Sequence, residues 1–85
     1  MKLIEKKRII KNKIIELVAH NNNLFDKIDV LKEKNGWYIR IILINGHVYH
    51  VCFETYKQVI AYLHGLDVAT DAMKWVSKKG VVNND

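Results

Sequence analysis

The sequence predicts an α+β domain with an N-terminal helix, a three-stranded antiparallel meander and two C-terminal helices packed on the sheet. Apolar residues recur at helical spacing over residues 2–19 and again after residue 55. Between them, two Asn-Gly dipeptides adjoin segments rich in β-branched and aromatic residues. At 85 residues the chain is expected to form one small globular domain (1–85), with residues 81–85 as a frayed tail.

The first helix is expected over residues 2–19 and carries most of the excess positive charge. Asparagines 21–23 should end it, because asparagine tolerates the left-handed conformation that closes helices. Lys7 and Lys11 fall inside the apolar sector of this helix. Either their methylene stems lie along apolar surface while the ammonium groups reach water, or the helix makes a second contact, to a partner. The first explanation is favoured.

Residues 24–34 have apolar residues at helical spacing, but they also precede Asn35-Gly36, a strong hairpin signal. We therefore predict a strand there. The next two strands are predicted from Trp37 to Ile44 and from His47 to Glu54, joined by a two-residue Asn45-Gly46 turn.

That turn fixes a predicted register in which Arg40 pairs with Val51 and Ile39 with Cys52. Both faces of this hairpin are then largely apolar, and we expect a homodimer or partner contact through the less covered face. The face expected to be exposed carries Tyr38, Arg40, Ile42, Ile44, His47, Tyr49, Val51 and Phe53.

Two helices are predicted after the hairpin. Thr55 and Gln58 form a capping box, and the apolar residues that follow have helical spacing. Gly65 is expected to close this helix, Asp67 or Thr70 to cap the next, and Gly80 to end it.

Charge and cysteine content restrict the function classes. The net charge is +5, and residues 1–20 hold six bases and two acids, hence 6 − 2 = +4. Only two of the 14 basic residues, Arg8 and Arg40, are arginines, which disfavours sequence-specific DNA reading. Cys52 is the only cysteine, so no disulfide framework is possible and a reducing compartment is expected. With no long apolar run we expect no membrane contact and a cytoplasmic location.

No catalytic residue, metal site or cofactor is predicted. In the expected register His47 lies on the face opposite His50 and Cys52, so these three residues cannot share a metal ion. Cys52 is interpreted as a small buried hydrophobic residue. The glycines are isolated, so no phosphate-binding loop is present, and the protein is predicted not to be an enzyme.

Our first functional hypothesis is a small non-catalytic protein-binding module, a phage or mobile-element accessory or inhibitory protein that occupies a partner's surface as a homodimer. The alternative is a nonspecific nucleic-acid binder, and a weaker one is a binder of a small anionic ligand between protomers. The candidate partner-binding residues are Tyr38, Arg40, Ile42, His47, Tyr49 and Phe53, and those of the basic helix are Lys6, Lys7, Arg8, Lys11 and Lys13.

Overall fold

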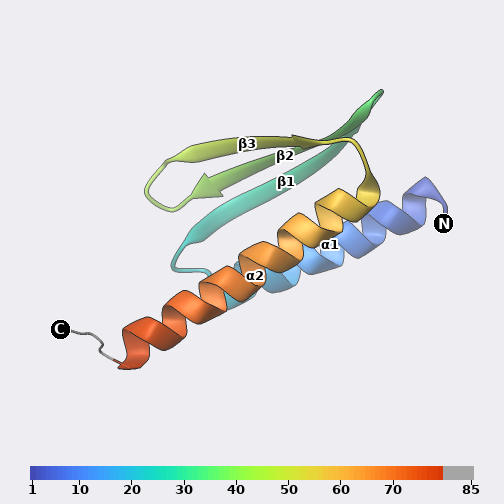
Figure 1. Ribbon diagram of the computed structural model, residues 1–85. Coiled ribbons are helices and arrows are strands. Elements are labelled where there is room, and N and C mark those ends of the chain that lie inside the picture. The colour runs from blue at the N-terminus through green and yellow to red at the C-terminus, as the bar shows by residue number, and fades with distance from the viewer. Residues whose placement is uncertain (80–85) are drawn as a thin grey trace.

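The computed structural model describes the backbone of residues 1–79 and the side chains of residues 1–70, and it confirms the α+β class (Figure 1). Along the chain, helix α1 is followed by three strands in the spatial order β1-β2-β3, both neighbouring pairs antiparallel, and then by helix α2. The predicted helix end at Gly80 and the tail 81–85 lie outside the described residues. The elements are α1 (Leu3–His20), β1 (Phe25–Glu33), β2 (Gly36–Leu43), β3 (Val48–Phe53) and α2 (Tyr56–Lys79).

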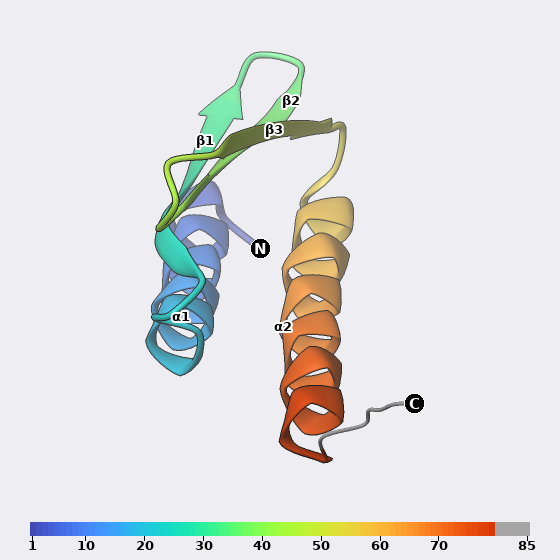
Figure 2. The ribbon, with the colours of Figure 1, turned by 90° about the vertical axis from the view of Figure 1, so that its left-hand side faces the viewer.

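Both helices lie on the same side of the sheet and run in the same direction (Figures 1 and 2). Helix α1 packs against β1 and α2, and α2 contacts β2 and β3. The core fills the space between the two layers, and its burial is the main source of stability for a domain of this size. Its buried apolar residues are Ile10, Leu17, Phe25, Ile28, Trp37, Ile39, Ile41, Val59 and Leu63.

Asn21 ends α1 as predicted, but not through a left-handed residue. Its φ is −132° and its ψ is 42°. The buried side-chain amide donates to the carbonyl of Leu17 at 2.9 Å, and the backbone carbonyl accepts from the N–H groups of Leu24 and Phe25, each at 2.9 Å. Asn21 therefore satisfies a helix-end carbonyl and also fixes the direction in which the chain enters β1.

The prediction of two C-terminal helices is wrong, since α2 continues through Gly65. Thr55 and Gln58 form the predicted capping box at its start, with reciprocal bonds of 3.0 and 3.2 Å. Thr70, expected as a possible cap, lies within the helix, where its hydroxyl donates to the carbonyls of Leu66 and Asp67. A single glycine weakens a helix without ending it when the flanking residues keep packing, and Leu63 is buried here.

Replacing Gly65 with alanine is expected to stabilise the protein by about 0.5–1 kcal/mol. An added Cβ would meet nothing within 4 Å, and the backbone is already helical. The gain comes from restricting the unfolded chain. Urea denaturation followed by circular dichroism should show a higher midpoint for Gly65→Ala. A lower midpoint would mean that α2 is interrupted at this position.

The first hairpin turn lies one residue earlier than predicted. Lys34 and Asn35 form it, and Gly36 already pairs with Glu33 at the start of β2. Gly36 is required for a different reason, because a Cβ there would lie 2.4 Å from the carbonyl oxygen of Phe53 on β3. This glycine marks close backbone approach between strands and not a turn.

The second hairpin has a three-residue loop, Ile44–Gly46, where two residues were predicted. Leu43 donates to the carbonyl of His47 and accepts from the N–H of Gly46, both at 2.9 Å. Gly46 has a φ of +93°, the left-handed residue that a three-residue hairpin loop needs. The register consequently shifts by one, so that Arg40 pairs with His50 and Ile39 with Val51.

This shift moves every β3 side chain to the face opposite the predicted one. Tyr49, Val51 and Phe53 join Ile39 on the helix-covered side. The expectation that both faces are apolar is therefore wrong, because the sheet has one apolar face under the helices and one mixed face. We call the mixed side the open face; it carries Lys27, Asp29, Leu31, Glu33, Tyr38, Arg40, Ile42, Val48, His50 and Cys52.

Candidate functional site

Only three of the six predicted partner-binding residues lie together on one surface. Tyr38, Arg40 and Ile42 do share the open face. The remaining members lie elsewhere: His47 precedes β3, and Tyr49 and Phe53 are on the helix side. Phe53 packs against Tyr62 of α2, with ring centroids 5.2 Å apart, and so contributes to the interior.

Polar groups on the open face bind one another. The guanidinium of Arg40 donates to one carboxylate oxygen of Asp29 on β1, with distances of 2.7 Å and 3.3 Å. This hydrogen bond, together with the negative charge of Asp29, raises the pKa of Arg40 above its ordinary value. Tyr38 stacks on His50 at a centroid separation of 5.5 Å, and its hydroxyl is hydrogen-bonded to Nδ1 of that ring. Much of the polar capacity of this face is thus engaged within the protein.

The predicted basic residues divide between two sides of α1. Lys6 places its ammonium 5.5 Å from the ring centroid of Tyr56 on α2, and Lys13, seven residues on, is half-buried. Lys7 and Lys11 are exposed beside β1, and Arg8 is exposed. A nucleic-acid binder was expected to use Tyr38 and Tyr49 together with these bases. The two tyrosines do not join the bases, because Tyr38 lies on the open face and Tyr49 lies on β3, at the edge of the sheet opposite β1.

A groove of about 510 Å³ lies between α1 and β1, and we call it the α1–β1 groove. Its floor reaches the buried residues Ile10, Ile28 and Trp37. Lysines from both elements stand on its walls, and Ile15 of α1 remains more than half exposed there. The other lining residues are Lys7, Lys11, Ile14 and Ile15 from α1 and Asp29, Val30, Leu31 and Lys32 from β1, of which Asp29 is ion-paired with Arg40.

The β1 side of this groove is the free edge of the sheet. The N–H of Ile44 bonds to the carbonyl of Leu24, so the even-numbered residues of β2 direct their backbone groups toward β1. Through the register, Asp29 and Leu31 pair with these residues. The backbone groups of Ile28, Val30 and Lys32 therefore point away from β2, along the groove.

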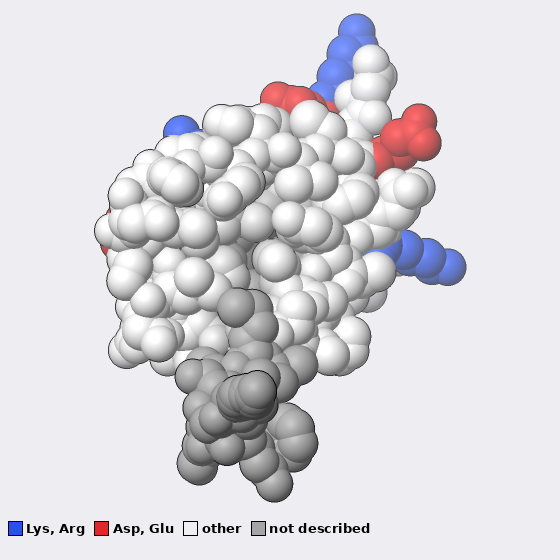
Figure 3. All heavy atoms as spheres, turned by 60° about the vertical axis from the view of Figure 1, so that its left-hand side comes forward, with Lys and Arg blue, Asp and Glu red and all other residues white. Residues whose placement is uncertain are grey.

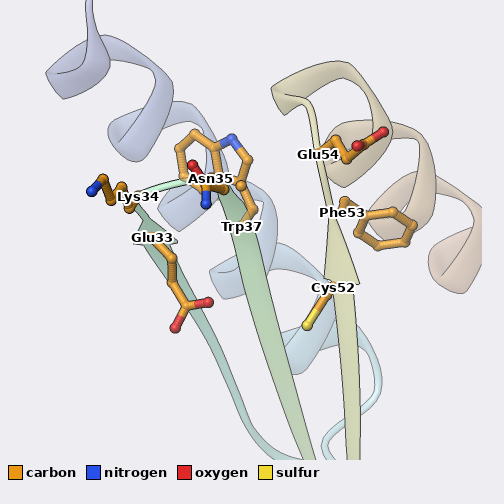
Figure 4. A pocket seen from close by; sticks show the side chains of 8 residues that line it. Glu33, Lys34, Asn35, Trp37, Cys52, Phe53 and Glu54 are labelled. Carbon is orange, nitrogen blue, oxygen red and sulfur yellow. The ribbon is translucent and has the colours of Figure 1, made fainter.

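A second hollow, of about 350 Å³, lies at the C-terminal end of β1 (Figure 4). It forms beside Gly36, which has no side chain, between the carboxylates of Glu33 and Glu54 and the thiol of Cys52. Cys52 is exposed, which contradicts its predicted burial. Among the side chains that the structure describes, no three potential metal ligands gather, here or elsewhere.

The groove was not predicted from the sequence, because its β1 wall depends on how β1 pairs with β2. The sequence identified Lys7 and Lys11 as anomalous within an apolar sector, and that anomaly marks the α1 wall. Lys32 on the opposite wall gave no separate signal, because a lysine in a strand is ordinarily solvated. Its ammonium lies 5.7 Å from the ring centroid of Trp37.

Within the described part of the chain, no helix is both long and apolar enough to cross a membrane. The chain matches no protein-family model, no curated protein and no solved structure.

Proposed function

We propose that this protein is a non-catalytic binding module that takes up an extended, acidic segment of a partner protein along β1. The observation that carries the proposal is the α1–β1 groove, in which an open strand edge lies beside a helix bearing exposed apolar and basic side chains. A segment bound there would add a fourth strand to the sheet, with backbone hydrogen bonds supplying affinity and side chains supplying specificity.

The backbone contribution comes from β1. Three alternate residues present a free backbone N–H and carbonyl at the outer edge of β1: Ile28, Val30 and Lys32. This spacing matches the hydrogen bonds of either an antiparallel or a parallel strand pair. Since side chains alternate along a strand, every second residue of the bound segment would point toward α1.

The chemistry of those side chains follows from the helix wall. Lys7 and Lys11 are one helical turn apart and exposed, and Ile15 continues the same line. The acids of α1, Glu5 and Glu16, lie on another face, roughly 120° and 140° around the helix from Lys11. Carboxylates alternating with aliphatic residues therefore complement this wall better than basic or purely apolar residues.

The proposal is tested with a fluorescent peptide of about eight residues that alternates glutamate with valine. Binding is measured by fluorescence anisotropy at low and moderate salt, and the site is mapped by backbone amide exchange. We expect slower exchange at Ile28, Val30 and Lys32 and no change at Asp29 and Leu31, whose N–H groups already face β2.

The double variant Lys7→Glu/Lys11→Glu is expected to weaken this binding by about tenfold or more, because two attractive charge pairs become repulsive. The matched control is Lys34→Glu/Lys57→Glu, which changes the net charge equally at exposed positions outside the groove. Equal loss in both variants would indicate general electrostatic attraction and would overturn the proposed site.

Two further probes separate strand addition from its rivals. A peptide N-methylated at alternate residues keeps its charge but loses the donors for β1, so it should bind much more weakly. Single- and double-stranded oligonucleotides test the nucleic-acid hypothesis, which predicts a steep fall in affinity with salt. Tight oligonucleotide binding without peptide binding would replace our proposal with that one.

A further inference from the structure

The opposite edge of the sheet, formed by β3, is also open. The bond from Leu43 to the carbonyl of His47 places the backbone groups of odd-numbered β3 residues toward β2. Those of Val48, His50 and Cys52 consequently point outward, away from the sheet. Both ribbon views place the helices on one side of the sheet, and no described element runs beside β3 in the plane of the sheet (Figures 1 and 2).

This edge carries none of the features that usually prevent unspecific pairing of edge strands, namely charged residues, proline or a bulge. Five of the nine residues of β1 are charged, so β1 is selective for a segment of complementary charge. The β3 sequence Val-Tyr-His-Val-Cys-Phe contains no Asp, Glu, Lys, Arg or Pro. The end of the molecule at which the β2–β3 turn lies presents almost no charged side chains (Figure 3).

We infer that β3 pairs antiparallel with β3 of a second copy of this chain, producing a continuous six-stranded sheet around a two-fold axis at His50. In this register His50 pairs with the partner's His50, and Val48 pairs with the partner's Cys52. All three outward-facing residues of each strand then lie in hydrogen-bonded pairs, and the same surface is used by both copies. A shift by two residues in either direction would leave part of this edge unpaired.

The side chains fit the same register. Tyr49 lies on the helix side of the sheet yet is 51% exposed, and Val48 on the open face is 45% exposed. In the dimer, Tyr49 lies opposite the partner's Val51, and Val48 lies opposite the partner's Cys52. The side chains of Tyr49 and Val48, which a monomer leaves exposed to water, therefore become covered. The α1–β1 grooves remain at the two outer edges of the joined sheet, so formation of the dimer does not depend on binding of a segment. A dimer would carry two such grooves and could bind a bivalent partner.

Sedimentation velocity across the micromolar range tests the dimer. The wild type is expected to shift from monomer to dimer as concentration rises, with slower amide exchange at Val48, His50 and Cys52. Val48→Lys should reduce association at least tenfold, because it introduces a charge into the unguarded edge. Leu31→Lys is the matched control, a charge placed on an apolar residue of the open face that is at least as exposed but lies on β1, and it should leave association unchanged.

The register is tested by cysteine crosslinking under an added disulfide oxidant. Val48→Cys should form a covalent dimer through the partner's Cys52, since directly opposite residues have the Cα separation that a disulfide accepts. Tyr49→Cys should not, because that side chain lies on the other face, and neither should Val48→Cys/Cys52→Ser. A chain that stays monomeric at all concentrations overturns the inference. A dimer that Val48→Lys does not weaken, or that Val48→Cys does not crosslink, overturns the proposed edge, and peptide binding at β1 can still be judged separately.

Discussion

Replacing Gly36 with alanine is expected to destabilise the fold by about 2–3 kcal/mol, a large share of the stability of a small domain. The new Cβ would stand 2.4 Å from the carbonyl oxygen of Phe53 and 3.4 Å from its carbonyl carbon. These are backbone atoms of the neighbouring strand, so no side-chain rotation relieves the contact and β3 itself must move. Chemical denaturation followed by circular dichroism and tryptophan fluorescence should show a markedly lower midpoint with an unchanged slope.

Two other glycines serve as controls for this prediction. Gly65→Ala introduces the same methyl group into open space in a helix and should raise the midpoint. Gly46→Ala also meets nothing within 4 Å but places alanine at a φ of +93°, so it should cost about 1 kcal/mol from backbone strain alone. A Gly36→Ala midpoint at or above that of Gly46→Ala would contradict the close approach of β2 and β3 at this position.

The order and type of most elements could be predicted from the sequence because local patterns determine them. Apolar spacing placed α1 within one residue of its observed limits, and β-branched residues with Asn-Gly dipeptides located all three strands. Gly65 was misread because a glycine inside a helix and a glycine after one look alike in sequence. What decides between them is whether residues on both sides continue to pack, which is a tertiary property.

The register of β2 and β3 could not be predicted, and the candidate site depended on it. A two-residue and a three-residue loop differ by one residue in a segment where almost every side chain is apolar. That segment gave no alternating pattern to choose between them, and a shift of one residue exchanges the faces of β3. Tyr38, Arg40 and Ile42 were placed together correctly because they belong to one strand, where alternation suffices.

The observed register also changes which surface an associating molecule is expected to cover. The largest buried residues of the sheet lie under the helices, and the open face holds ion-paired and hydrogen-bonded groups. Among the strand residues, the exposed large apolar side chains lie on the two edge strands, as Leu31 on β1 and as Val48 and Tyr49 on β3, while the others lie on the helices, at the N-terminus and in the β2–β3 loop. Association along strand edges therefore accounts for more of this surface than association through a face.

The helix-covered face is the part of the fold on which stability depends most, and Ile39→Ala should show this with a loss of about 3–4 kcal/mol. Ile39 is fully buried on the central strand, where it pairs with Val30 on β1 and Val51 on β3 and faces the core formed with α2. Its truncation removes three methyl or methylene groups and leaves a cavity that two strands and a helix cannot readily fill.

Ile42→Ala is the matched control for Ile39→Ala. It makes the same change in β propensity on the same strand but on the open face, where Ile42 is half-buried between Lys27 and Val48. We expect it to cost about 1 kcal/mol, and the difference between the two variants isolates the contribution of packing against the helices. Urea denaturation of both variants at the same protein concentration measures that difference and keeps any dimer contribution equal. Equal losses would mean that the two faces of β2 are buried to the same extent, and the one-sided arrangement of the helices would then be wrong.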